Sequence, residues 1–273
     1  MTHIETQDLS YALAANSVSQ VFENLSSSTV DATLDVLADS LACGLGGTRS
    51  PGMEAARSAA ALWGTQGSTV WGGFGQAPAP IAAMLNASSL GALDFEDTDD
   101  AVPLHVCSVV LPALLADIEQ SRPDCDGREF LTALAVGIDT TMRIGRAGGP
   151  KGTRGWNWGL ISASLGAMLA VARVRCWSTD VTVSALGHQL SQLSGALQSI
   201  MEGQLGARFL PGFAARDVLM SAALASAGIS GPRNVFDGRA GVINLYQDGQ
   251  FDRASVVSGI EQCSLVELSL IHI

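Results

Sequence analysis

The sequence is poor in the features that mark nucleic-acid-binding and disulfide-rich proteins. Only 15 of its 273 residues are Lys or Arg, against 26 Asp or Glu, so the formal net charge is −11. A broadly acidic chain is poorly suited to bind nucleic acid or an anionic membrane surface. The five cysteines contain no C-x-x-C pair. This pattern suggests neither a disulfide framework nor a zinc site and indicates reduced thiols.

Long hydrophobic runs and targeting signals are also missing. The longest apolar stretch, residues 160–174, is shorter than the ~20 residues that a transmembrane helix requires. Residues 1–10 lack the basic and apolar regions of a signal peptide. We therefore expect a cytoplasmic protein with no membrane or nucleic-acid partner.

The chain is rich in small apolar residues, and many of its apolar residues recur at helical spacing. Hydrophobic residues make up 47% of it and aromatic residues 5%, a composition that favours closely packed helices. Apolar residues recur at helical spacing from 30 to 45, and Asp126 or Gly127 can cap a helix over 129–146. Further helices are expected over 7–23, 51–63, 79–93, 106–119, 160–174, 180–200 and 213–227. Without an internal repeat or a clear linker, this pattern predicts one large all-α domain.

The most unusual segment is residues 93–105, which hold five acids within seven residues and end in one of only four histidines. If the first half of the segment is helical, Asp94, Asp97 and Thr98 share one face of that helix, and His105 returns from the following loop. A carboxylate, a hydroxyl and an imidazole can together perform general acid–base chemistry. An acidic helix end exposed to solvent explains the same residues without a site.

A second unusual segment is the glycine-rich loop of residues 148–159, which contains Lys151 and Arg154. These cations precede the N-terminus of an expected helix, where an anion can bind. The loop does not match the phosphate-binding pattern G-x-x-x-x-G-K-[ST]. A surface loop stiffened by two tryptophans is the alternative interpretation.

The order and spacing of several motifs resemble the MmgE/PrpD family, which includes 2-methylcitrate dehydratases, cis-aconitate decarboxylases and iminodisuccinate epimerases. The resemblance extends from about residue 30 to 246, and its landmarks are the segments 39–47, 93–98 (Leu-Asp-Phe-Glu-Asp-Thr), 134–145, 211–215 and 231–238. It implies a large helical domain followed by a smaller α+β lid, usually in a homodimer.

The resemblance also implies which residues form a site. Asp94 and Thr98 stand where family active-site residues stand, within a motif that reads L-D-F-D-D-T in the family. His105 corresponds to a family histidine. Another catalytic histidine of the family falls on Asn157. A later lysine and histidine fall on positions 207 and 210, here Ala and Leu, and between them Arg208 is retained.

These matches indicate a lyase, most similar to 2-methylcitrate dehydratase, that acts on a small di- or tricarboxylate by acid–base proton abstraction. In this hypothesis His105 is the acid or base and Asp94 positions it or shares its proton. The substrate-binding candidates are Thr98, Asn157, Arg208, Arg154 and Lys151. No metal and no organic cofactor are implied.

Three alternatives stay open. The enzyme can be a decarboxylase or an epimerase of the same family. The altered positions also fit a degenerate paralogue that binds a carboxylate or assembles with an active partner. Finally, Asp94, Asp97 and Asp100 have the D-x-x-D-x-x-D spacing of Mg²⁺-dependent helical isoprenoid synthases, although no second acidic helix follows.

The last six residues, 268–273, read Leu-Ser-Leu-Ile-His-Ile, which is what a common sequencing-library adapter encodes in one reading frame. We therefore expect a helical domain of residues 1–267, without the α+β lid, followed by a non-native tail. Such a truncation predicts a cleft that is open on one side and leaves the activity of this chain in doubt.

Overall fold

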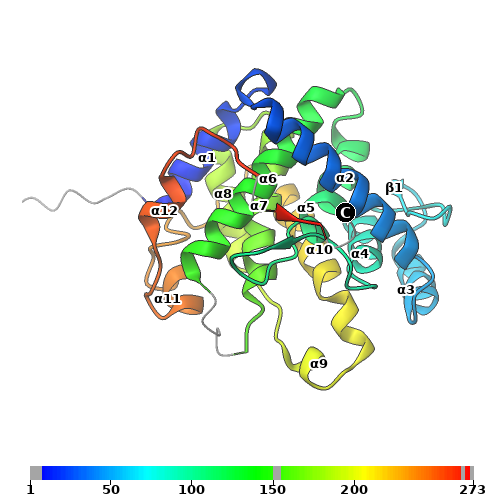
Figure 1. Ribbon diagram of the computed structural model, residues 1–273. Helices are drawn as coiled ribbons and strands as arrows, with labels where there is room; N and C mark the ends of the chain where they lie inside the picture. The colour runs from blue at the N-terminus through cyan, green and yellow to red at the C-terminus, as the bar shows by residue number, and fades with distance from the viewer. Residues whose placement is uncertain (1–7, 150–154, 266–267, 271–273) are drawn as a thin grey trace, which may run out of the picture.

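The computed structural model describes residues 8–149, 155–265 and 268–270, which form a helical bundle with α7 near its centre (Figure 1). All residues of α7 (Trp158–Val174) except Gly159 and Arg173 are buried. The helices that pack against it are α1 (Leu9–Ser19), α5 (Cys107–Ser121), α6 (Gly127–Gly148), α8 (Thr179–Leu190) and α10 (Leu210–Ser226). The predicted all-α class is confirmed.

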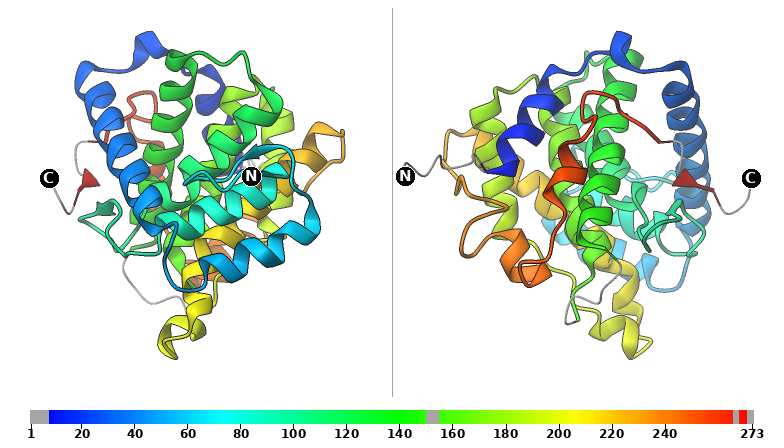
Figure 2. Two further views of the ribbon diagram at one scale, coloured as in Figure 1. Left: turned by 90° about the vertical axis from the view of Figure 1, so that its right-hand side faces the viewer. Right: turned by 60° about the vertical axis from the view of Figure 1, so that its left-hand side comes forward.

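Further helices cover this centre. The longer ones are α2 (Ser27–Gly47), α3 (Met53–Ala60) and α4 (Ala79–Leu90), and α4 packs against α2, α5 and α10. The short ones are η1 (Phe22–Asn24), η2 (Ala61–Trp63), α9 (Gln198–Met201), η3 (Leu205–Phe209), α11 (Val242–Gln247) and α12 (Arg253–Val257). In both views of Figure 2 the yellow segment around α9 projects from the bottom of the bundle. Within the described ranges, no helix combines the length and the apolar character needed to cross a membrane.

Two small antiparallel strand pairs accompany the helices. β1 (Ser68–Thr69) pairs with β2 (Gln76–Ala77). β3 (Thr98–Asp99) pairs with β4 (Leu268–Ser269) so that Thr98 faces Ser269. Leu268 and Leu270 are partly buried and pack against the core. Residues 268–270 of the segment that we expected to be a tail therefore lie beside the acidic segment, and the non-native origin of that segment stays a prediction.

Small residues set the distance between the central helices. A methyl group on Gly137 of α6 would lie 2.7 Å from Cγ1 of Val110 and 2.9 Å from Cβ of Ala170. One on Gly166 of α7 would lie 2.5 Å from the carbonyl oxygen of Gly137. Side chains at these positions would force α6 and α7 apart, since protein interiors have no spare volume. The abundance of small residues in the sequence thus has a direct packing role.

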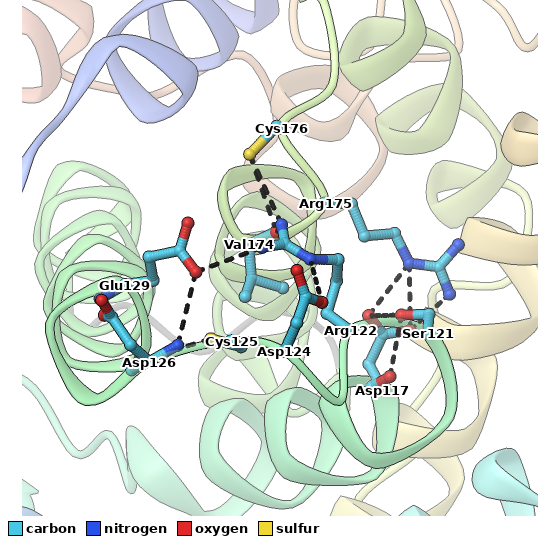
Figure 3. Close-up of polar contacts among 10 residues, drawn as sticks. All are labelled: Asp117, Ser121, Arg122, Asp124, Cys125, Asp126, Glu129, Val174, Arg175 and Cys176. Carbon is cyan, nitrogen blue, oxygen red and sulfur yellow. Dashed lines mark hydrogen bonds and ion pairs between the residues drawn. The ribbon is translucent and has the colours of Figure 1, made fainter.

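Buried and partly buried ion pairs join the ends of α5, α6 and α7 (Figure 3). Arg175, just after α7, binds the carboxylate of Asp117 on α5, and the side chain of Asp117 is only 2% exposed. Arg122, just after α5, donates to Asp124 at 3.0 Å and to Glu129 of α6 at 3.1 Å. It also donates to the last carbonyl group of α7. These contacts fix three core helices relative to one another.

Several predicted helices end earlier than expected, among them α1, which ends at Ser19. α4 ends at Leu90, so residues 93–98 are not helical and the predicted helical face shared by Asp94, Asp97 and Thr98 is wrong. The helix predicted over 180–200 ends at Leu190 and is followed by a non-helical segment before α9. In that segment the carbonyl group of Gly195 accepts a hydrogen bond from the backbone of residue 157. This long-range pairing competes with helix formation.

Candidate active site

A cavity of about 390 Å³ lies between the loop that joins α4 to α5, the start of α7 and the segment that leads into α10. Within the described part of the chain its ionisable lining residues are Asp94, Glu96 and His105, and Asn157 lies at the start of α7. Much of the remaining wall is apolar and includes Trp156, Trp158, Leu160, Leu197, Ile200 and Leu210. The volume and the mixture of apolar wall with a few polar groups are typical of a small-molecule site.

Asp97 anchors the acidic loop to α5. Its carboxylate is fully buried and accepts hydrogen bonds from the backbone amides of Val106, at 2.9 Å, and Cys107, at 3.1 Å. These amides lie at the positive end of α5, where a carboxylate is favoured. Burial nevertheless raises the pKa of Asp97 to about 7, and the two amide hydrogen bonds oppose that shift. Asp97 is therefore a structural anchor.

Asp99 is a second buried anchor in the same loop. Its Oδ2 atom lies 2.7 Å from Nε of Arg146 on α6, and its Oδ1 atom accepts from the amide of Ala101 at 2.8 Å. Glu96, Asp97 and Asp99 are each less than 5% exposed. The interpretation of the segment as an acidic end exposed to solvent is therefore wrong for three of its five acids.

The backbone of the loop orients His105. Its Nδ1 atom lies 3.1 Å from the carbonyl oxygen of Asp97, and because a carbonyl oxygen can only accept, Nδ1 must carry a proton. Neutral His105 then has its lone pair on Nε2, which lies 3.8 Å from Oδ1 of Asp94. Oγ1 of Thr98 lies 3.4 Å from Nδ1. The structure thus brings Asp94, Thr98 and His105 together.

Asp94 reaches His105 through an unusual backbone conformation. Its φ angle is +58°, in the left-handed region that costs an ordinary side chain on the order of 1 kcal/mol but that Asp tolerates better than most. Its side chain is 88% exposed. The sharp turn after α4 therefore directs an exposed carboxylate toward the imidazole.

Glu96 is a site residue that sequence reasoning missed. It is 4% exposed and lines the cavity. Its Oε2 atom is buried and has no hydrogen-bond partner among the described residues. Burial raises the pKa of its carboxyl group, and nearby His105 opposes the shift. A signal was present in the sequence, because the family motif has Asp at this position.

The same three lining residues are the group whose arrangement comes nearest to a metal site. One ligand atom from each of Asp94, Glu96 and His105 lies within 4.8 Å of the others. Among the described residues, this group does not include Asp97 or Asp100, and the Asp97 carboxylate is already bound to backbone amides. The D-x-x-D-x-x-D spacing therefore does not gather its acids around one point.

The positions where the family resemblance placed other reactive side chains do reach the cavity. Asn157, Ala207 and Leu210 all line it. The side-chain oxygen of Asn157 also caps α7 by accepting from the amide of Leu160 at 3.2 Å. Three positions of the wall thus carry an amide or an aliphatic group in place of a titratable group.

The predicted cationic groups are placed differently. The guanidinium group of Arg208 donates to the carbonyl oxygen of Ala92, and Arg208 is not among the residues that line the cavity. Lys151 and Arg154 lie outside the described residues. None of the described lining residues is Lys or Arg.

The chain is similar to a known family model and to curated fungal proteins. The family model of the MmgE/PrpD N-terminal domain matches residues 12–254. The chain is 36% identical over 223 residues to the cis-aconitate decarboxylase-like protein oryM of Aspergillus oryzae, an alignment that covers 78% of this chain and 46% of that protein. It is 28% identical over 250 residues to cis-aconitate decarboxylase of Aspergillus terreus, with 87% and 51% covered. The chain thus spans about half the length of the curated relatives it matches.

Proposed function

Because the chain belongs to the MmgE/PrpD family, we propose that it acts as a lyase on a small di- or tricarboxylate, with decarboxylation as its reaction. The observation that carries the proposal is that Asp94 and His105 line one cavity, with the hydroxyl of Thr98 beside the imidazole. The names of the relatives favour decarboxylation over the 2-methylcitrate dehydration that the sequence suggested. Dehydration and epimerisation are the alternatives within the family.

His105 is the proposed acid–base group. In its protonated form Nε2 carries a proton toward the cavity, while Nδ1–H stays on the carbonyl group of Asp97. Asp94, 3.8 Å away, stabilises the positive charge. In a decarboxylation the bond to the departing carboxylate breaks, CO₂ leaves, and the electron pair left on the substrate takes up the proton from Nε2. Water then returns a proton to His105.

Substrate binding is the proposed role of Thr98, Asn157, Arg208, Lys151 and Arg154. Asn157 lies on the cavity wall, and the Thr98 hydroxyl lies beside the imidazole. Arg208 would have to exchange its contact with residue 92 for a substrate carboxylate, an exchange of one acceptor for a charged and stronger one. A homodimer in the cytoplasm, active without a metal or an organic cofactor, completes the proposal.

A non-catalytic carboxylate-binding protein is the second candidate. It is favoured by one observation: Asn157, Ala207 and Leu210 line the cavity at the positions where the family has reactive side chains. Such a protein would retain the shape of the site and bind the same acids without converting them.

The test is an assay of the purified chain with cis-aconitate and 2-methylcitrate, following both CO₂ release and dehydration. We expect CO₂ release from cis-aconitate, and a reduction of kcat by about 10²–10⁴-fold in His105→Asn. The matched control is His188→Asn, because His188 contacts the carbonyl group of Ile229 at 2.8 Å and does not line the cavity. Full activity of His105→Asn would exclude the acid–base role. Dehydration without CO₂ release would replace the decarboxylase proposal, and binding without turnover of either acid would favour the non-catalytic candidate.

A further inference from the structure

We propose that Glu96 binds the substrate while its own side chain is a neutral carboxylic acid. In this form Glu96 donates a hydrogen bond to one of the substrate's carboxylates. This inference rests on the proposed function only for the substrate class, a small polycarboxylate. It goes beyond that function by assigning a binding group and a proton that accompanies binding.

The position of Glu96 makes it available to a ligand in the cavity. It lines the cavity, and one of its carboxyl oxygens lies within 4.8 Å of ligand atoms of both Asp94 and His105. Its Oε2 atom is buried without a hydrogen-bond partner among the described residues. A buried polar atom without a partner is costly and uncommon in native proteins. A ligand that supplies the missing partner would remove that cost.

The charge of the cavity decides which form of Glu96 can bind an anion. Asp94 and Glu96 both line it, and the described lining residues include no Lys or Arg. If both acids were ionised, a polycarboxylate would meet two like charges and two groups that can only accept hydrogen bonds. A neutral Glu96 removes one of these charges and provides an O–H donor in its place.

The surroundings of Glu96 favour the neutral form. The titratable groups that interact electrostatically with Glu96 are Asp94 and Asp97 in the same loop, His105 at the end of that loop and the thiol of Cys43 on α2. Burial is the largest influence and raises the pKa of Glu96. His105 and hydrogen bonds with the backbone of residues 95 and 96 oppose the shift, and Asp94 adds to it. Deprotonation as the pH rises would therefore convert the proposed donor into a second negative charge and weaken binding.

Calorimetric titration with propane-1,2,3-tricarboxylate, a saturated tricarboxylate, tests the proposal without requiring turnover. With EDTA present, we expect the affinity of the wild-type chain to fall with rising pH, approaching tenfold per pH unit above the pKa of Glu96. Glu96→Gln keeps an N–H donor but cannot ionise, so it should bind within about threefold of the wild-type affinity at acidic pH and lose most of this dependence.

Further measurements sharpen the result. Glu96→Asp, which restores the family residue, should keep a pH-dependent affinity, and circular dichroism would verify that each variant is folded. Titrations in buffers of different ionisation enthalpy should show more proton uptake on binding by the wild type than by Glu96→Gln at alkaline pH. Glu54→Gln, at an exposed residue of α3, is the matched control and should behave like the wild type.

The proposal is overturned if Glu96→Gln shows the wild-type pH dependence. It is also overturned if EDTA abolishes binding and Mn²⁺ restores it, because Asp94, Glu96 and His105 would then hold a metal. A wild-type chain that binds no tricarboxylate at any pH would overturn it as well. Proton-linked binding without turnover would support the role of Glu96 while rejecting the proposed enzymatic activity, so the two failures are distinguishable.

Discussion

Replacing Asp97 with Ala should loosen the loop that carries the site and destabilise the fold. The substitution removes the carboxylate that accepts from the amides of Val106 and Cys107 at the start of α5. The backbone carbonyl group of residue 97, which holds His105, would then lie on a loop that has lost its anchor. We therefore expect losses in both stability and activity, although Asp97 does not line the cavity.

The size of the stability loss follows from these two amides. Loss of a capping side chain costs about 0.5–2 kcal/mol, and each buried donor left without a partner costs about 1–3 kcal/mol. Because these contributions overlap and water can reach part of the opened site, we expect about 2–4 kcal/mol in all. In a chain of this size that corresponds to a decrease in Tm of roughly 5–15 °C.

Asp97→Asn is the informative partner of that variant, because Asn keeps an oxygen that can accept from one amide but does not titrate. Burial raises the pKa of Asp97 from 3.8 to about 7 in the folded state, so the folded protein binds this proton more tightly than the unfolded chain does. The contribution of the proton to stability is present in full below about pH 4 and is lost as the pH rises to about 7. That window corresponds to about 4 kcal/mol, and Asp97→Asn should lack this loss.

Thermal and urea unfolding of the wild type and both variants, repeated between about pH 4 and pH 8, would check this reasoning. A Tm of Asp97→Ala equal to that of the wild type would show that the loop does not depend on this anchor. An unchanged pH dependence in Asp97→Asn would assign the titration to another buried acid, such as Asp139.

Two packing predictions can be measured by the same unfolding experiments. Asp117→Ala should cost about 3–5 kcal/mol because it leaves Arg175 partly buried without its carboxylate. Glu23→Ala, at an exposed ion pair, should cost less than about 1 kcal/mol. Equal losses of stability in the two variants would contradict the argument from burial. Gly137→Ala should cost about 1–3 kcal/mol by overpacking the contact between α6 and α7. Its control is Gly127→Ala, because a methyl group at that position meets nothing within 4 Å. A Gly137→Ala variant as stable as the wild type would show that these helices can move apart.

Much of the helical framework was predictable because helix signals are local. Asp126 caps α6 and forms a capping box with Glu129, as expected from residues only three positions apart. The helical spacing of apolar residues from 30 to 45 falls within α2. Family resemblance singled out Asp94, Thr98 and His105, and the structure brings these three together although the helical face used to explain their spacing does not exist.

The sequence by itself determined the fold class, most helix positions and which segment would hold the ionisable residues. Tertiary structure alone decided which acids of that segment anchor it and which line the cavity, because burial depends on neighbours far away in the chain. Asp97 is held by the start of α5 and Asp99 by Arg146 of α6. The Oε2 atom of Glu96 is buried without a hydrogen-bond partner among the described residues. Five neighbouring acids of similar chemistry thus acquire different roles from the helices that pack around them.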